Sequence, residues 1–148
     1  MIAETQEQVH VVCAACLSEN RVPAARLGEA PKCGRCGAAL LDGTPAALDE
    51  AKFEPYVGRS GLPVLVDFWA PWCGPCRAMA PAFEKAASVL AASVRFAKVN
   101  TEEAPAVAAR FGIRAIPTLV LFRGGREVAR ISGALDQGSL VRWVGEHL

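Results

Sequence analysis

The feature that most constrains the fold is a pair of cysteines placed where a strand pattern gives way to a helix pattern. Cys73 and Cys76 are separated by two residues, follow the apolar run 63–70 and open a helix-like segment from about 74 to 92. A helix N-terminus presents unpaired N–H groups and a partial positive charge, which stabilise an anion. A cysteine there has its pKa lowered from about 8.5 toward 7 or below, and its thiolate is the nucleophile of disulfide exchange. The sequence therefore predicts that Cys73 attacks disulfides and that Cys76 resolves the mixed disulfide.

Length and composition predict a packed protein with room for one domain of roughly 100 residues and a small module. Of the 148 residues, 52% are hydrophobic and 21% are charged, and the net charge is +1. This balance offers no basic field to nucleic acid or anionic lipid, so we expect neither partner. No apolar run approaches the roughly 18 residues of a membrane span, and we see no signal peptide at the start. We therefore expect a cytoplasmic protein, and a monomer because no feature demands more.

Two further cysteine pairs, within the first 41 residues, have the spacing of a structural zinc site. Sixteen residues separate Cys16 from Cys33, which falls inside the range typical of such sites. Four thiolates complete a tetrahedral shell and leave no position for a catalytic water. A segment this short needs a metal or disulfides to fold, so zinc would supply most of its folding free energy. Two local disulfides, or a redox role for these pairs, remain alternatives, and His10 is expected to be a surface residue. The predicted ligands are Cys13, Cys16, Cys33 and Cys36.

Strand and helix patterns alternate from about residue 45 onward, which predicts a mixed sheet with helices on both faces. The predicted domains are a metal-binding module at 1–41 and an α/β domain at 45–148, joined by a short turn cluster. Thr101 is expected to cap a helix that stops at Gly112. The expected strands are 46–48, 64–69, 94–99, 117–122 and 127–132; the other expected helices are 49–57, 74–92 and one from about 136, whose buried face holds Leu140, Trp143, Val144 and Leu148.

Asp67 and Lys98 are charged residues within the apolar strands of this domain. Period-two alternation places Asp67 on one face with Leu65 and Trp69, and it sets Lys98 on one face with Phe96. Poor solvation should raise the pKa of the Asp67 carboxyl, which suits a general base that deprotonates Cys76. The strand pattern fits a buried structural aspartate equally well. Lys98 by itself fits a lysine whose stem packs while its amine reaches water.

Four motifs follow one another in this domain: Asp67-Phe68-Trp69-Ala70, Trp72-Cys73-Gly74-Pro75-Cys76, Pro81 and Ile116-Pro117-Thr118. In this order they resemble the thioredoxin family, and the resemblance covers the whole stretch from residue 45 to 148. With the four-cysteine module in front, the chain is similar to the zinc-containing second type of bacterial thioredoxin. The resemblance implies a thioredoxin fold, a redox-active Cys73–Cys76 disulfide and reduction of protein disulfides. It also implies rereduction by an NADPH-dependent thioredoxin reductase.

The resemblance further implies roles for single residues. Lys98 would pair with Asp67, and a cis Ile116–Pro117 bond would sit beside Cys73 and leave the Ile116 backbone free to pair with a substrate peptide. Without the resemblance, Pro117 would be a proline at a strand start. Pro81 should kink its helix. The implied substrate surface also includes Trp72, Gly74, Pro75, Gly133 and Ala134, with Ser132 standing where the family often has valine.

The dipeptide between the two central cysteines bears on the direction of the reaction. Oxidases and isomerases of the same fold usually carry a histidine there, so Gly74-Pro75 favours a reductant. A disulfide oxidase or isomerase is the first alternative. A zinc-based redox sensor or holdase is the second, because oxidation of the four N-terminal cysteines would eject the metal and unfold the module.

Overall fold

A computed structural model of the chain describes residues 7–148; residues 1–6 of the predicted metal-binding module lie outside the described residues. The first elements of the described residues are an antiparallel hairpin of β1 (Gln8–Val12) and β2 (Glu19–Pro23), followed by a short 3₁₀ turn, η1 (Ala24–Arg26). A five-stranded sheet follows, in the order β3-β5-β4-β6-β7. Its strands are β3 (Ala46–Ala47), β4 (Val64–Trp69), β5 (Arg95–Asn100), β6 (Thr118–Arg123) and β7 (Arg126–Ser132).

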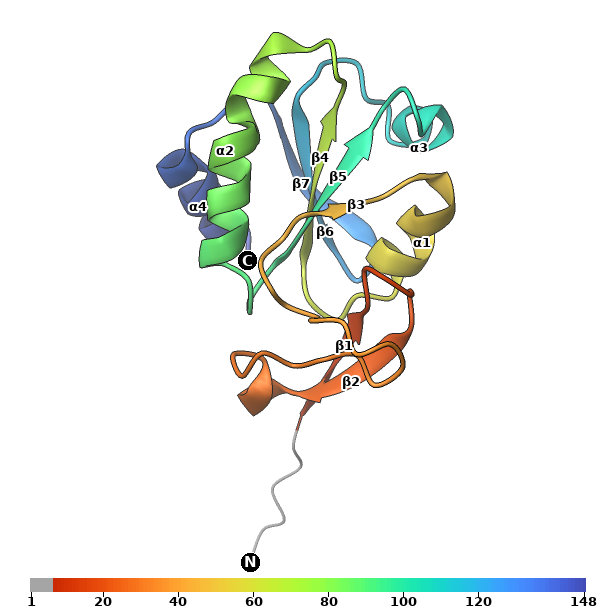
Figure 1. The fold of residues 1–148 in the computed structure, drawn as a ribbon. Helices are drawn as coiled ribbons and strands as arrows, with labels where there is room; N and C mark the ends of the chain where they lie inside the picture. Colours follow the sequence, from red (N-terminus) through yellow and green to blue (C-terminus); the bar gives the residue numbers. More distant parts are fainter. Residues whose placement is uncertain (1–6) are drawn as a thin grey trace, which may run out of the picture.

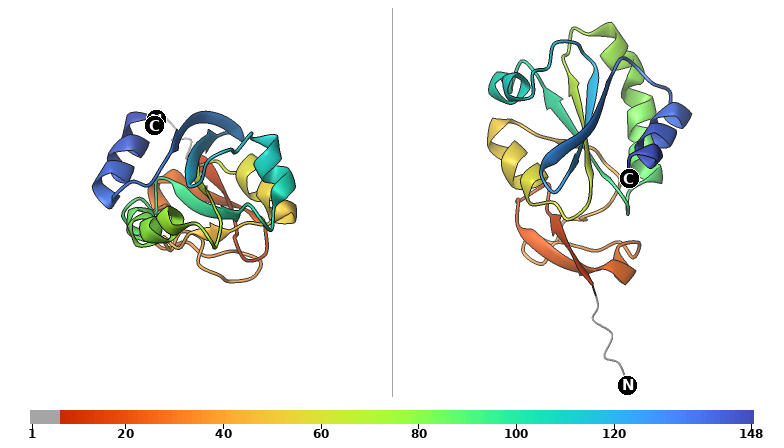
Figure 2. Two further views of the ribbon diagram at one scale, coloured as in Figure 1. Left: turned by 90° about the horizontal axis from the view of Figure 1, so that it is seen from above. Right: turned by 180° about the vertical axis from the view of Figure 1, so that it is seen from behind.

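This sheet is mixed, and helices cover both of its faces, as the sequence predicts (Figures 1 and 2). Strands β3, β5 and β4 run parallel, whereas β6 and β7 are antiparallel to their neighbours. Helices α1 (Glu50–Gly58) and α3 (Pro105–Arg110) lie on one face, and α2 (Gly74–Val89) and α4 (Gln137–Glu146) lie on the other.

Each face of the sheet has its own apolar core. The first, which we call the α1-face core, contains Phe53 and Val57 of α1 packed against Val66 and Phe68 of β4. The second, the α2-face core, contains Phe83, Leu140 and Val144 packed against Leu65. Because β4 contributes alternate residues to the two cores, it is buried on both sides and fixes where α2 starts.

The third predicted helix starts later than expected. Residues 101–103 form a turn, and α3 begins at Pro105, whose missing N–H costs least in a first turn. Thr101 is not its cap, because its hydroxyl donates to the Trp69 carbonyl at 3.2 Å and its N–H bonds the same oxygen at 2.9 Å. The residues at this position therefore tie the end of β5 to the end of β4.

Two other helix ends also differ from expectation. Helix α2 stops at Val89, short of 92, and a turn follows in which Ser93 donates to the Leu90 carbonyl. Helix α4 stops at Glu146, so Leu148 is exposed and does not share the buried face of Leu140 and Val144. Asp49 and Asp136 cap α1 and α4, each accepting a backbone N–H.

The β1–β2 hairpin and the loop after it, residues 7–41, form a unit that we call the ribbon. The ribbon lies against the end of the sheet where β4 begins, opposite the end where α2 begins (Figure 1). The Gly61 N–H donates to the His10 carbonyl at 2.8 Å, and a Cβ at Gly61 would come within 2.8 Å of the His10 nitrogen. Val12 and Leu17 of the ribbon pack into the α1-face core. The two parts of the chain therefore share apolar packing.

Candidate active site and metal centre

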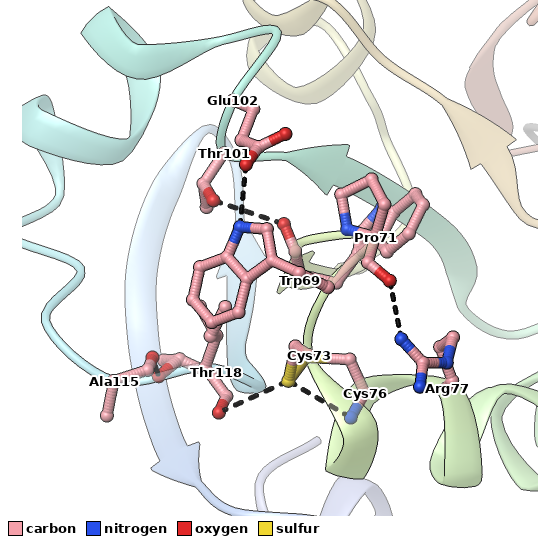
Figure 3. Close-up of a disulfide and its surroundings, with 11 residues drawn as sticks. Trp69, Pro71, Cys73, Cys76, Arg77, Thr101, Glu102, Ala115 and Thr118 are labelled. Carbon is pink, nitrogen blue, oxygen red and sulfur yellow. Dashed lines mark hydrogen bonds between the residues drawn. A yellow bond between two sulfur atoms is a disulfide. The ribbon is translucent and has the colours of Figure 1, made fainter.

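The junction of β4 and α2 places the central cysteine pair at a helix N-terminus, as the sequence predicts. Cys73 caps α2, and its Sγ accepts the Cys76 N–H at 3.2 Å. The two sulfurs form a disulfide with a Cα–Cα distance of 5.3 Å, so the structure is that of the oxidised form (Figure 3). The guanidinium of Arg77 donates to the Pro71 carbonyl at 2.7 Å and braces the loop before the pair.

A cis peptide bond between Ile116 and Pro117 lies beside the disulfide, as the resemblance implies. The Cys73 Sγ is 3.7 Å from the Ile116 carbonyl oxygen. The Gly133 N–H donates to the Pro117 carbonyl at 2.9 Å, and Gly133 has a φ of 102°, which favours glycine. The hydroxyl of Ser132 bonds that of Thr118 at 2.9 Å. Three segments far apart in the sequence thus meet around the Cys73 sulfur.

Trp72 is the most exposed large apolar side chain among the described residues, at 66%. Its Nε1–H donates to a Glu102 carboxylate oxygen at 2.6 Å, which fixes the indole near the disulfide. Gly74 and Pro75 are exposed next to it. Sequence reasoning placed Glu102 in a helix and missed this contact, because a residue in a polar turn carries no periodic signal for a partner 30 positions away.

Asp67 lies fully buried, and neither of its carboxylate oxygens has a hydrogen-bond partner among residues 7–148. Burial raises its pKa from 3.8 to about 7, and the charge of Lys98 opposes part of that rise. Asp67 and Lys98 are register partners on β4 and β5. No direct ion pair joins them among the described residues, so Lys98 acts on Asp67 through its charge alone. The Lys98 ammonium lies 4.7 Å from the centroid of the Trp69 ring. A carboxyl that titrates near neutral pH can accept and return a proton there.

The four N-terminal cysteines meet at one point of the ribbon. Their sulfurs all lie within 4.8 Å of one another, with Cys13 and Cys36 at 3.6 Å and Cys16 and Cys33 at 3.7 Å. A tetrahedron with Zn–S bonds of about 2.3 Å has edges of roughly 3.8 Å, so the spacing fits a Zn²⁺ ion. The four side chains are free thiols, which disfavours the alternative of two local disulfides.

The surroundings favour a thiolate at two of these sulfurs, Cys33 and Cys16. At Cys36 the Ala38 N–H lowers the pKa, but the contact with Cys13 and burial outweigh it and raise the pKa to about 11. The backbone N–H groups of Cys36 and Arg35 lower the pKa of Cys33 to about 6. The Asn20 side-chain amide donates to the same sulfur at 3.6 Å. His10 lies outside the cluster, where it pairs with Glu19, as expected for a histidine that is not a ligand. The donor set and its geometry therefore support zinc binding.

A dithiol pair that is closed in this structure and can reopen by exchange defines the class of thiol–disulfide oxidoreductases. Comparison with known families identifies the family within this class. A model described as Thioredoxin matches residues 44–146, and one described as Thioredoxin 2, N-terminal, matches residues 12–38. The chain belongs to the thioredoxin family, and its fold and its protein-disulfide oxidoreductase activity are those of that family.

The alignments with curated relatives differ in whether they are long enough to include the ribbon. The chain is 48% identical over 138 residues to thioredoxin C-3 of Corynebacterium nephridii, which spans 93% of this chain and 94% of the relative. It is 47% identical over 103 residues to thioredoxin 1 of Synechococcus elongatus, 70% of this chain and 96% of the relative. The second alignment is too short to include the ribbon along with the oxidoreductase part. Among the described residues, no helix is long and apolar enough to span a membrane.

Proposed function

We propose that the chain is a reductant of protein disulfides that works through Cys73 and Cys76. The observation that carries the proposal is the position of the Cys73 Sγ, at the N-terminus of α2 and 3.7 Å from the Ile116 carbonyl oxygen. In the reduced protein, the Cys73 thiolate attacks one sulfur of a substrate disulfide and releases the other as a thiolate. The Cys76 thiolate then attacks Cys73, which frees the second substrate sulfur and closes the disulfide seen here. The substrate gains two electrons, and the pair loses them.

Asp67 is the proposed acceptor of the Cys76 proton in the second step. Its carboxyl is buried on β4, the strand that leads into the dithiol, and its pKa of about 7 lets it take up a proton at neutral pH. Lys98 is a positioning residue in this proposal, because its charge limits the rise of that pKa. Any water that links Asp67 to Cys76 would fill the unused hydrogen-bonding capacity of the carboxylate.

The substrate is proposed to lie extended beside the cis-proline. The residues proposed to contact it are exposed or half-buried, and the Ile116 carbonyl oxygen lies 3.7 Å from the Cys73 Sγ. A backbone segment of the substrate can pair with the free groups of Ile116, as an added strand does. The proposed contact residues are Trp72, Gly74, Pro75, Ile116, Gly133 and Ala134, with Pro117 holding the bond that shapes the site.

We also propose a reductase partner, a structural zinc ion and a cytoplasmic location. An NADPH-dependent thioredoxin reductase would restore the dithiol, and zinc would hold the ribbon as a structural ion. Four free thiols and a recyclable dithiol suit the reducing cytoplasm. We propose a monomer of two units, residues 1–41 and 45–148, with neither nucleic acid nor membrane as a partner.

The first test is the equilibrium reduction potential of the Cys73–Cys76 pair in zinc-loaded protein. A reduction potential near −270 mV, the value typical of thioredoxin, supports a reductant. A value near −120 to −180 mV matches oxidants and isomerases, and it would reverse the proposed direction.

A second test separates the roles of the two cysteines. Cys76→Ser should trap substrates as mixed disulfides on Cys73, because the resolving thiol is gone. Cys73→Ser is the matched control and should trap none, since Cys76 lies inside α2 and lacks the N-cap position that stabilises the Cys73 thiolate. Non-reducing gels of a reaction with a disulfide-containing protein read out both variants. Equal trapping by the two variants would contradict the assignment.

A further inference from the structure

Arg95 joins the ribbon to the oxidoreductase domain by a contact that the function above does not use. It is the first residue of β5 and is buried, at 6% exposed. Its Nη1 donates to the Val12 carbonyl at 3.0 Å, across 83 positions of sequence. Its guanidinium also lies 4.7 Å from the centroid of the Tyr56 ring of α1. The side chain thus points from the sheet toward the peptide that precedes the first metal ligand, Cys13.

This burial poses a charge problem. A guanidinium taken out of water costs free energy unless an anion or several acceptors compensate it. No ion pair of the described residues involves Arg95. The cavity of about 330 Å³ between ribbon and domain is lined by Arg95 and by one acid, Asp42. Asp42 is exposed, and its Oδ1 is engaged by the Thr44 N–H at 2.9 Å.

A compensating charge is available in the metal centre itself. Zn²⁺ with four thiolates carries a net charge of two negative units. Tyr56 is near both groups: burial raises its pKa most, the Arg95 charge lowers it, and the charges of Asp42 and then Cys13 raise it. Ala14, between the ligands Cys13 and Cys16, lines the same cavity as Arg95.

We propose that Arg95 is the buried counter-charge of the zinc–thiolate centre. Its guanidinium offsets part of the negative charge of the metal site, and its bond to the Val12 carbonyl fixes the peptide that presents Cys13. Arg95 is a positioning residue in this arrangement, since its side chain bonds the Val12 carbonyl and acts on Cys13 through that peptide. Residues that support metal ligands in this way typically change metal affinity by about 10- to 100-fold when they are replaced.

The test is the zinc dissociation constant of the full chain, measured by competition with a chromophoric chelator. Arg95→Met keeps the packing against Tyr56 and removes the charge, so it should weaken zinc binding by about 10- to 100-fold. Arg95→Gln keeps an N–H donor for Val12 without the charge and should weaken binding as well. Arg95→Lys keeps the charge and should retain most of the affinity. Arg59→Met is the matched control, because it removes an exposed positive charge that acts on Glu19 of the ribbon, and it should leave the constant unchanged.

Two results would overturn the proposal. Zinc affinity of Arg95→Met equal to that of the parent chain would show that the charge plays no part. Equal weakening in Arg95→Lys and Arg95→Met would assign the effect to shape. Co²⁺ in place of Zn²⁺ verifies a four-sulfur site in every variant, through its thiolate charge-transfer absorption.

Unfolding measured with and without metal separates this role from core packing. Ordinary packing would lower the free energy of unfolding equally in both forms, which means an unchanged zinc affinity. A counter-charge lowers it more in the zinc-loaded form. If Arg95→Met does not fold, Arg95→Gln against Arg95→Lys decides the same question.

Discussion

At the scale of single residues, Asp67 should dominate the pH dependence of stability. Burial raises its pKa from 3.8 to about 7, so the folded chain keeps a proton that the unfolded chain has already released. The contribution to stability is therefore fully present below pH 3.8 and is lost as pH rises through 7. At 1.36 kcal/mol per pKa unit, the loss above pH 7 reaches up to about 4 kcal/mol. We expect Asp67→Asn to be more stable than the parent chain by an amount that grows from near zero at pH 4 toward that value.

Denaturant unfolding of both oxidised chains between pH 4 and pH 8.5 checks this prediction. Asp136→Asn is a control of opposite sign, because the Ser139 N–H lowers the pKa of the Asp136 carboxyl. Its stability relative to the parent should not rise with pH. Parallel curves for Asp67→Asn and the parent would mean that Asp67 is not the buried acid that the structure shows.

At the scale of elements, the two turns that carry the metal-binding cysteines, residues 13–17 and 33–37, share one backbone hydrogen-bond pattern. We call these turns the knuckles. The Leu17 N–H donates to the Cys13 carbonyl at 2.8 Å, and the Gly37 N–H donates to the Cys33 carbonyl at 2.9 Å. Both residues are left-handed, with φ of 62° and 78°. Glycine adopts this conformation freely, whereas a side chain costs roughly 1–2 kcal/mol. Leu17 accepts the strain because its side chain packs into the α1-face core.

The left-handed backbone at Leu17 should therefore reverse the usual order of stability between an alanine and a glycine substitution at this position. Leu17→Ala loses the packing and keeps the strain, and Leu17→Gly loses the packing and relieves the strain. Leu17→Gly should be the more stable of the two by about 1 kcal/mol, measured by unfolding of the zinc-loaded chain. Gly37→Ala, which adds strain alone, should destabilise by a similar amount. If the Leu17→Ala chain is as stable as the Leu17→Gly chain, or more stable, the left-handed backbone at residue 17 does not cost the free energy expected here.

The elements also show what local patterns can and cannot predict. The sheet, α2 and the knuckles follow from the spacing of apolar residues and cysteines, because each signal lies within a few turns of chain. The start of α3 does not, since Thr101 bonds the Trp69 carbonyl in preference to capping a helix. The Arg95–Val12 bond is likewise invisible in the sequence, where an arginine beside Phe96 reads as one polar residue of a strand.

At the scale of the whole molecule, the start of α2, which carries the redox pair, and the ribbon, which carries the metal centre, lie at opposite ends of the five-stranded sheet (Figure 1). The ribbon has a small core of its own, around Val11, Val22 and Leu40. That core is too small to hold the ribbon folded without further support. The metal and the contacts with the larger domain must supply the rest. The sharing of Val12 and Leu17 between the two parts couples zinc binding to the packing of α1.

Zinc removal should therefore loosen the larger domain as well as the ribbon, and the loosening should start where they touch. The amide of Gly61 reports the contact, because its N–H donates to the His10 carbonyl of β1. After removal of zinc by a chelator under reducing conditions, we expect faster hydrogen exchange at Gly61 and a lower unfolding midpoint. Amides in the centre of β4, such as that of Val66, should stay protected because both sheet faces remain covered. Re-addition of zinc should restore both values. Unchanged exchange at Gly61 in the metal-free chain would show that the ribbon stays docked by its apolar contacts alone, and that the metal stabilises only the loops that hold it.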